Sequence, residues 1–340
     1  MLLAAVKSHV LAGFDDPVIG RERWNSLVQQ GATDAMFLTW QWQRAWWEAF
    51  GRGRLLLIAI ERQGQVVAIA PLFSDSGMVF FVGSGGSDYL DFIGDIRDPA
   101  VLDAILETAR DHVQDFLGFR FYHVLESSPT GQRLKEAADR LGLTCFDEGK
   151  LAAPQLNLVA HPEVALAATK KQSLVRHEAF FRREGRLDVR HLRDEGAILA
   201  QLDLFFSQHI ARWEAMPHPS LFHDPLKRAF YERLTRRMAD TGWLRFTRVE
   251  WNDRPIAFHF GFCYGGRFMW YKPSFAIDLA RRSPGEVLLR QLLLAAIEEG
   301  AHTFDFGLGD EPFKRRFATH TAHVGTWGLY PSVPAVPVQV

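Results

Sequence analysis

The chain has 340 residues, with 39 Lys and Arg against 40 Asp and Glu and a formal net charge of −1. This length exceeds a typical single domain of roughly 100–200 residues and suits two domains. The balanced charge provides no whole-chain field for nucleic acid or an anionic membrane. No stretch approaches the roughly 20 apolar residues of a membrane span, so we expect no membrane insertion.

Two further observations bear on the cellular setting. The only cysteines, Cys145 and Cys263, stand in apolar or strand-like stretches, so we expect neither a disulfide framework nor a zinc site. The first 14 residues do not show the pattern of a secretory signal. We therefore expect a reducing, cytoplasmic location.

The first half of the chain alternates helix and strand patterns. Four helices are predicted, at 22–30 and after Thr39, Asp98-Pro99 and Ser128-Pro129, where N-cap residues or a first-turn proline stand. Four strands are predicted, at 55–61, 66–73, 79–82 and 119–125. The glycine-rich loop 83–89 lacks the Lys-Ser/Thr ending of a P-loop, so a nucleotide-phosphate role is not expected for it.

A linker is predicted at 150–162, and a basic segment follows it. That segment contains Lys170, Lys171, Arg176, Arg182, Arg183, Arg186, Arg190 and Arg193. Glu178, Glu184 and Asp188 dilute its charge, which favours a solvated helix over a nucleic-acid surface. Two further helices are expected, one through 202–213 and one from Asp224-Pro225 to Gly242.

The most regular stretch of the sequence lies between Trp243 and Phe317. Apolar residues alternate through 256–262, which is typical of a strand with one buried face. Asn252-Asp253 and Gly265-Gly266 flank this strand, and both pairs accept the positive φ that tight hairpins need. A third strand at 267–272, a helix from Ser283-Pro284 to Gly300 and a fourth strand at 302–307 complete the order.

The start of that helix is predicted to bind an anion. A helix N-terminus offers free N–H groups, and Gly285 has no Cβ to keep a phosphate away from the backbone. Arg281 and Arg282 stand beside it, and Ser283 is expected as the N-cap. The run 282–287 is similar to the pyrophosphate loop of GNAT acyltransferases, Arg/Gln-x-x-Gly-x-Gly/Ala, with Val287 in place of the small last residue. These residues are our cofactor-binding candidates: Arg281, Arg282, Ser283 and Gly285.

The order of elements in the first half repeats in the second. Residues 61–68 align with 250–257 as strand end, turn and strand start, and each half then has a strand, a loop, a proline-started helix and a strand. We interpret this as an internal duplication of one α/β unit.

Three segments carry a resemblance to a known family. Residues 271–275 (Tyr-Lys-Pro-Ser-Phe), 283–286 (Ser-Pro-Gly-Glu) and 309–314 (Gly-Asp-Glu-Pro-Phe-Lys) resemble those of CelD-type GNAT acyltransferases, tandem-GNAT proteins related to the Fem aminoacyltransferases. The resemblance covers nearly the whole chain. It implies an α/β fold of two tandem GNAT-like domains, each a mixed, mostly antiparallel sheet flanked by helices. We place them at 1–155 and 156–340, with the acyl-CoA site in the second.

The resemblance also directs the choice of catalytic candidates. GNAT chemistry requires a positioned amine, N–H donors for the thioester oxygen and removal of a proton. His259 is our candidate base because histidine is neutral near pH 7, and Asp305 and Asp310 are candidates for orienting the acceptor. Many GNAT enzymes have a tyrosine that protonates the departing thiolate, whereas this chain has Phe313.

The acceptor is expected to contact residues of both halves, in a cleft between them. The candidates are Tyr89 and Asp91 of the first half and Tyr271, Lys272 and Lys314 of the second. The alternative for Tyr271 and Lys272 is a purely structural place at the end of a strand.

We therefore predict an acyltransferase that moves an acetyl or longer acyl group from acyl-CoA to a small-molecule or sugar-like acceptor, without a metal. The acceptor group is an amine, with a hydroxyl as the alternative. Two other functions stay open: Fem-like transfer from aminoacyl-tRNA, and a non-catalytic GNAT-like module in polysaccharide biosynthesis. The acyl chain, the acceptor and the oligomeric state are not determined by the sequence.

Overall fold

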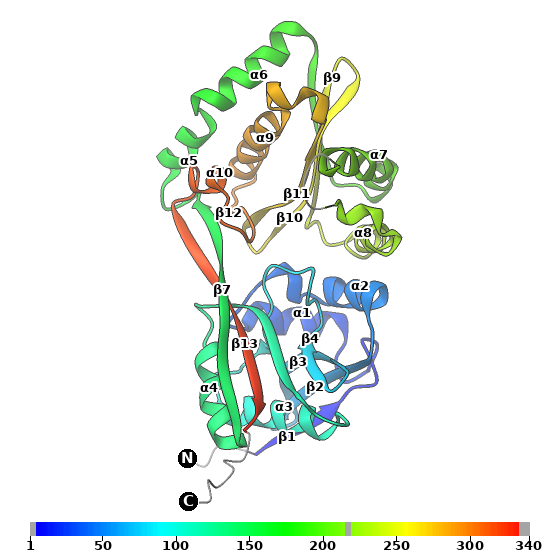
Figure 1. Ribbon diagram of the computed structural model, residues 1–340, viewed down its shortest axis with the longest axis vertical. Coiled ribbons are helices and arrows are strands. Elements are labelled where there is room, and N and C mark those ends of the chain that lie inside the picture. The colour runs from blue at the N-terminus through cyan, green and yellow to red at the C-terminus, as the bar shows by residue number, and fades with distance from the viewer. Residues whose placement is uncertain (1–4, 215–218, 333–340) are drawn as a thin grey trace, which may run out of the picture. The chain divides into compact units, whose positions relative to one another are not determined.

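A computed structural model describes residues 5–214 and 219–332 (Figure 1). The chain divides into two compact units. Unit 1 is Met1–Leu151 together with His323–Val340, and unit 2 is Ala152–Ala322. The predicted division, at 155, assigned everything after it to the second domain, whereas the strand that begins near residue 320 returns to unit 1.

Unit 1 contains a sheet and four α-helices. Its strands are β1 (Val6–Val10), β2 (Arg54–Arg62), β3 (Gln65–Asp75), β4 (Met78–Phe81), β5 (Ile93–Gly94) and β6 (Gly118–Leu125), with portions of β7 (Leu143–Asn157) and β13 (His320–Pro331). Its helices are α1 (Arg21–Gln30), the short 3-10 helix η1 (Met36–Leu38), α2 (Trp40–Phe50), α3 (Pro99–Asp111) and α4 (Thr130–Leu141).

Unit 2 contains the remaining elements. Its strands are β8 (Leu187–Leu192), β9 (Leu244–Trp251), β10 (Arg254–Tyr264), β11 (Arg267–Phe275) and β12 (Thr303–Asp305), with the end of β7. Its helices are α5 (Pro162–Thr169), α6 (Gln172–Glu184), α7 (Glu195–Trp213), η2 (Leu221–His223), α8 (Pro225–Arg237), η3 (Ile277–Arg282), α9 (Pro284–Glu298) and α10 (Pro312–Arg315).

The two units share one connectivity. In unit 1, β2, β3 and β4 pair antiparallel in sequence order, and α3 then crosses to β6, which pairs parallel with β4. In unit 2, β9, β10 and β11 pair antiparallel, and α9 crosses to β12, which pairs parallel with β11. Each crossover strand has an antiparallel neighbour on its far side, β13 beside β6 and β7 beside β12.

The turns that join these strands have the backbone conformation that the sequence predicts. Asn252 and Asp253 have φ of 51° and 62°, and Gly265 and Gly266 have φ of 55° and 73°. Left-handed residues at both central positions match the twist of a two-residue hairpin. In contrast, the predicted linker at 150–162 is wrong over its first half, because β7 continues to Asn157.

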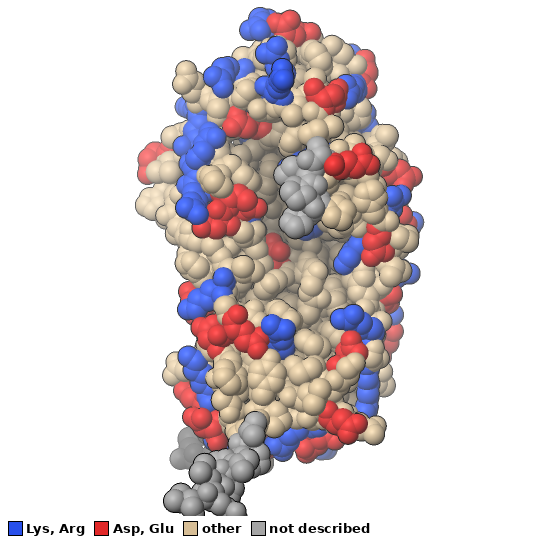
Figure 2. Space-filling view, in the orientation of Figure 1, with Lys and Arg blue, Asp and Glu red and all other residues tan. Residues whose placement is uncertain are grey.

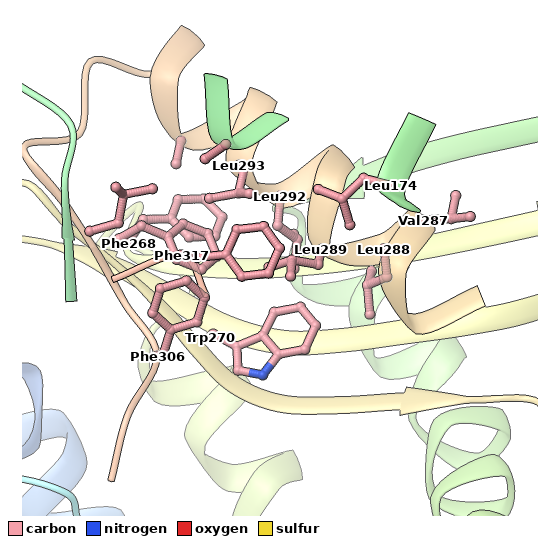
Figure 3. Close-up of a cluster of buried hydrophobic side chains, with 14 of the residues drawn as sticks. Leu174, Phe268, Trp270, Val287, Leu288, Leu289, Leu292, Leu293, Phe306 and Phe317 are labelled. Carbon is pink, nitrogen blue, oxygen red and sulfur yellow. The ribbon is translucent and has the colours of Figure 1, made fainter. Parts of the chain in front are cut away.

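Helices cover both faces of the unit 2 sheet (Figure 1). On one face, α9 packs its leucines against β10 and β11, with Leu288, Leu292 and Leu293 fully buried in the same cluster as Phe268 (Figure 3). On the other face, α7 places Phe205 against Phe246, Phe258 and Phe260 of β9 and β10. The strand β10 is buried on both faces from Ile256 to Phe262, so the expectation of a single buried face is wrong.

Candidate active site

A cavity of about 230 Å³ lies in unit 2 where β11 and β12 separate. The two strands pair over only three residues, from Arg267–Thr303 to Met269–Asp305, and β11 then continues to Phe275. The cavity is lined by residues from α7, the end of β11, η3, the first turns of α9 and the segment of α10: Arg212, Trp270, Pro273, Ser274, Phe275, Ala280, Ser283, Gly285, Glu286, Leu288, Leu289, Phe313 and Phe317. Ligands of open α/β sheets bind at such openings beyond the carboxyl ends of parallel strands.

The start of α9 forms one end of this cavity. Pro284 occupies the first helical position and has no N–H, and the N–H groups that follow lack partners one turn back in the helix. A Cβ at Gly285 would lie 3.2 Å from the Phe275 ring, so glycine allows the ring to pack against the helix start. Two of the four predicted cofactor residues, Ser283 and Gly285, line the cavity.

The other two predicted cofactor residues lie at the same helix end but do not line the cavity. Arg281 and Arg282 are exposed at the end of η3. The Arg282 guanidinium lies over the Phe180 ring, 4.2 Å from its centroid. Both therefore contribute positive charge near the N-terminus of α9 without forming part of the cavity wall.

Ser283 occupies the N-cap position of α9, as expected, but its side chain makes no capping hydrogen bond. Its backbone is left-handed, with φ of 53° and ψ of 57°. Its carbonyl oxygen instead accepts from the N–H of Glu286 at 3.0 Å. The side-chain hydroxyl is thus not used for capping the helix that follows.

A β-bulge lies in β11 beside the cavity. Phe260 pairs with Lys272 and Phe262 with Met269, so Gly261 stands opposite both Trp270 and Tyr271. The bulge directs the N–H of Tyr271 towards the Nε2 atom of His259, 3.2 Å away. Bulges frequently occur next to active sites because they redirect backbone and side-chain groups.

His259 fills the space under this bulge. The residue is fully buried, its ring stacks on Phe268 and Trp270, and its Nε2 lies 3.0 Å from the Met269 carbonyl oxygen. Burial, which disfavours the charged ring, lowers the pKa of His259 to about 3. This position does not support the predicted role as a general base, because the ring has no accessible surface and does not line the cavity.

Asp305 is also enclosed. Its carboxylate accepts a hydrogen bond from the Arg267 guanidinium at 3.0 Å and from the N–H of Gly307 at 2.8 Å, and the side chain has no exposed surface. These contacts fix the end of β12 and the turn after it. Asp305 therefore has a structural role in this turn, and its position does not support the predicted contact with an acceptor.

The two remaining candidates after β12 differ in exposure. Asp310 is exposed and forms an ion pair with Arg315. Lys314 is buried, and its ammonium donates to the Leu308 carbonyl oxygen at 2.6 Å and lies 2.8 Å from the Glu311 carboxylate. Lys314 thus holds the turn before α10, and neither residue lines the cavity.

Tyr271 and Lys272 face away from the cavity. The Tyr271 ring packs against Phe262 and Tyr231, on the side of the sheet covered by α8. The Lys272 ammonium lies 4.1 Å from the centroid of that ring. Both residues belong to the strand that borders the site, but neither lines the cavity.

The two candidates in unit 1 are interior residues. Asp91 is fully buried and accepts hydrogen bonds from the hydroxyls of Thr33, Ser128 and Thr130 at 2.5–2.6 Å. Burial raises the pKa of Asp91, and these hydroxyls oppose the shift. Tyr89 is equally buried. These contacts join loops within unit 1 and do not support the predicted binding of a substrate.

Sequence reasoning missed three residues of the cavity wall. Trp270 was not a candidate and Phe313 was noted only for the missing tyrosine, yet both line the cavity, with ring centroids 6.4 Å apart. Arg212 carries no sequence signal, because it stands at the end of an otherwise apolar helix. Among the described residues, no three His, Cys, Asp or Glu side chains come together as metal ligands, and no helix is long and apolar enough to cross a membrane.

Comparison with known proteins supports the same fold. Residues 168–315 match the model of the acetyltransferase (GNAT) domain family. The crystal structure of FemX is similar, with a TM-score of 0.67 and 12% identity over 91% of this chain and 96% of that one. A conserved protein of unknown function from Bacteroides thetaiotaomicron VPI-5482 gives a TM-score of 0.59 at 12% identity, covering 94% of this chain and 100% of that one.

A third similar structure is the C-terminal domain (DUF2156) of a putative lysylphosphatidylglycerol synthetase from Agrobacterium fabrum, with a TM-score of 0.56 and 15% identity over 89% of this chain and 88% of that one. At such identities the likeness concerns the fold alone. No curated protein sequence matches the chain. The predicted α/β fold with mixed sheets flanked by helices is confirmed, and the GNAT domain match supports an acyltransferase.

Proposed function

We propose that this protein transfers an acetyl or longer acyl group from acyl-CoA to an amine, or to a hydroxyl, of a small-molecule or sugar-like acceptor. The observation that carries the proposal is the cavity between the end of β11 and the first turn of α9, within the part of the chain that matches the GNAT domain. We also propose a cytoplasmic location, as expected from the two cysteines and the N-terminal sequence.

The residues of the cavity suit the parts of an acyl-CoA donor. A diphosphate fits the start of α9, where N–H groups, Gly285 and the nearby Arg281 and Arg282 favour negative charge. The apolar wall, formed by Trp270, Leu288, Leu289, Phe313 and Phe317, suits the pantetheine arm and the acyl chain. The donor then lies beside the free edge of β11.

In this proposal the protein acts mainly by position. The neutral amine attacks the thioester carbonyl, so that a C–N bond forms and the C–S bond breaks. The attacking nitrogen loses a proton to water, and the departing thiolate takes a proton from water. Holding both reactants together supplies much of the rate.

The charge of unit 2 fits a small anion better than a tRNA. Figure 2 shows Lys and Arg interspersed with Asp and Glu over the visible face rather than gathered into one basic surface. In the basic segment, Glu178 forms an ion pair with Arg182, and Asp188 forms one with Arg190. Glu178 also pairs with Arg290 of α9. A tRNA requires many unpaired cations along a phosphate backbone, so these pairs support a CoA donor over the Fem-like alternative.

The test is calorimetry of CoA binding to the Gly285→Asp variant, with Gly285→Ala as the matched control. Both substitutions crowd Phe275, but only the aspartate adds negative charge where the diphosphate is placed. We expect the dissociation constant of CoA to rise about tenfold more in Gly285→Asp than in Gly285→Ala, which corresponds to about 1.4 kcal/mol. Equal CoA affinity in the two folded variants would reject the assignment.

A further inference from the structure

Arg212 at the end of α7 brings a cation to the cavity. Its Nη1 atom donates to the Pro273 carbonyl oxygen at 2.9 Å, at the edge of β11 that continues past β12. The guanidinium also lies over the Phe275 ring, 4.3 Å from its centroid. An arginine has five N–H donors in a planar fork, so one hydrogen bond to Pro273 leaves most of them without a protein acceptor.

This guanidinium has no counter-charge in the described part of the chain. Among the described residues, no carboxylate lies within ion-pair distance of Arg212, whereas many other arginines of both units pair with Asp or Glu, for example Arg245 with Glu299 at 2.8 Å. Burial lowers the pKa of Arg212, and no neighbouring charge opposes this shift. Removing an unpaired charge from water is costly unless something compensates for it.

The other polar groups of the cavity do not supply the compensation. Glu286, which has the one carboxylate among the described lining residues, lies 3.5 Å from His177 and 3.4 Å from Arg316. Ser274, on the same stretch of β11, is fully buried, and its hydroxyl has no hydrogen-bond partner. The Oε2 atom of Glu286 also lacks a hydrogen-bond partner, but this carboxylate is not within ion-pair distance of Arg212, so the guanidinium has no counter-charge in the described cavity wall.

We propose that Arg212 binds an oxyanion of a substrate in this cavity, either a carboxylate of the acceptor or a phosphate of the donor. Both groups match the planar fork of a guanidinium and accept two parallel hydrogen bonds. The inference rests on the proposed function for the identity of the substrate, but the anion site itself stands on the geometry of Arg212. Because no described carboxylate pairs with it, the guanidinium is available to an anionic ligand.

A purely structural role makes a different prediction. If Arg212 serves only to cap the β11 edge and stack on Phe275, its loss should destabilise the fold. If it is kept for ligand binding, Arg212→Met should leave the melting temperature unchanged or raised, because an apolar side chain removes an uncompensated charge at similar volume. Arg183→Met is the control, since Arg183 lies on α6 and is exposed.

The experiment compares the full chain with Arg212→Met, Arg212→Lys and Arg183→Met by calorimetry. The probes are CoA, pantetheine, inorganic diphosphate and glutarate, and acetyl transfer from acetyl-CoA is measured with β-alanine against propylamine. A donor phosphate predicts that Arg212→Met weakens CoA and diphosphate about tenfold to a hundredfold and leaves pantetheine unchanged. An acceptor carboxylate predicts weaker glutarate binding and a lost preference for β-alanine, with CoA unchanged.

The outcomes separate this inference from the proposed function. If folded Arg212→Met binds CoA, diphosphate and glutarate as the parent does and has the same acceptor preference, the anion site is rejected. Should Arg212→Met fail to fold, the same comparison is made with Arg212→Lys, which keeps the charge but loses the fork. A parent protein that binds diphosphate or glutarate through Arg212 but shows no CoA binding or acyl transfer would reject the proposed function and retain the anion site.

Discussion

Burial under the β11 bulge determines the chemistry of His259. A single nitrogen, Nε2, faces both the Met269 carbonyl oxygen and the Tyr271 N–H, and Nδ1 has no hydrogen-bond partner. A neutral ring can satisfy only one of these two backbone groups at a time. With a pKa lowered to about 3, the ring stays neutral over the range in which an amine substrate reacts.

The pKa of His259 predicts how stability depends on pH. In the unfolded chain the ring has a pKa of roughly 6.5, so between that value and about 3 the unfolded state binds one more proton than the folded state. The stability of the parent relative to His259→Leu should therefore fall on acidification, approaching about 1.4 kcal/mol per pH unit below pH 6. Urea unfolding at pH 7, 5.5 and 4.5 measures this difference, and a constant difference would show that His259 titrates normally.

The site residues show which roles a sequence can predict. Gly285 could be chosen as a candidate from the sequence because a glycine in the first turn of a helix is a local signal for anion binding, and this role stays a prediction. His259 and Asp305 were misjudged because strand alternation predicts which face a residue takes, but not that α9 or Arg267 covers that face. Arg212 could not be chosen from the sequence. It is a candidate because no described carboxylate lies near it, and only the packed structure shows which side chains surround it.

At the scale of elements, the bulge between β10 and β11 depends on Gly261. A Cβ at this position would overlap the His259 ring and lie 2.5 Å from the Met269 carbonyl oxygen. The backbone oxygen cannot move aside without disturbing the ladder. The glycine therefore permits the histidine and the bulge to occupy the same short stretch of sheet.

We expect Gly261→Ala to lower the free energy of unfolding by about 2 kcal/mol or more, as overpacking of a closed site does. Gly196→Ala is the control, because a Cβ there would make an ordinary contact with Asp194 in the first turn of α7 and should be neutral or slightly stabilising. Both are measured by urea denaturation. Similar stabilities for the two variants would mean that the bulge tolerates a side chain.

Most elements with local signals were predicted, and those with distant partners were not. Asn252-Asp253 and Gly265-Gly266 mark two hairpins, and Gly300, with φ of 70°, follows the end of α9. In contrast, the pairing of β13 with β6 joins residues about 200 positions apart, and no local turn motif in the sequence predicts it. The end of β7 was likewise predicted as a linker because its partner strand, β12, lies about 150 residues further along the chain.

For the whole molecule, the repeated connectivity raises the question of which unit binds the donor. Every residue that lines the proposed cavity belongs to unit 2. In unit 1, the loop between β4 and α3 places Tyr89, Asp91 and Phe92 in its own core. We therefore assign the donor site to unit 2, although the two units share the same order of strands.

Hydrogen–deuterium exchange of the full chain with and without CoA tests this assignment most directly. CoA bound in the cavity should slow amide exchange in residues 271–275 at the end of β11 and in the first turn of α9, and leave the strands of unit 1 unchanged, because ordering and exclusion of water are local to the bound ligand. No protection at saturating CoA, or protection confined to β3, β4 and α3 of unit 1, would contradict the donor site in unit 2.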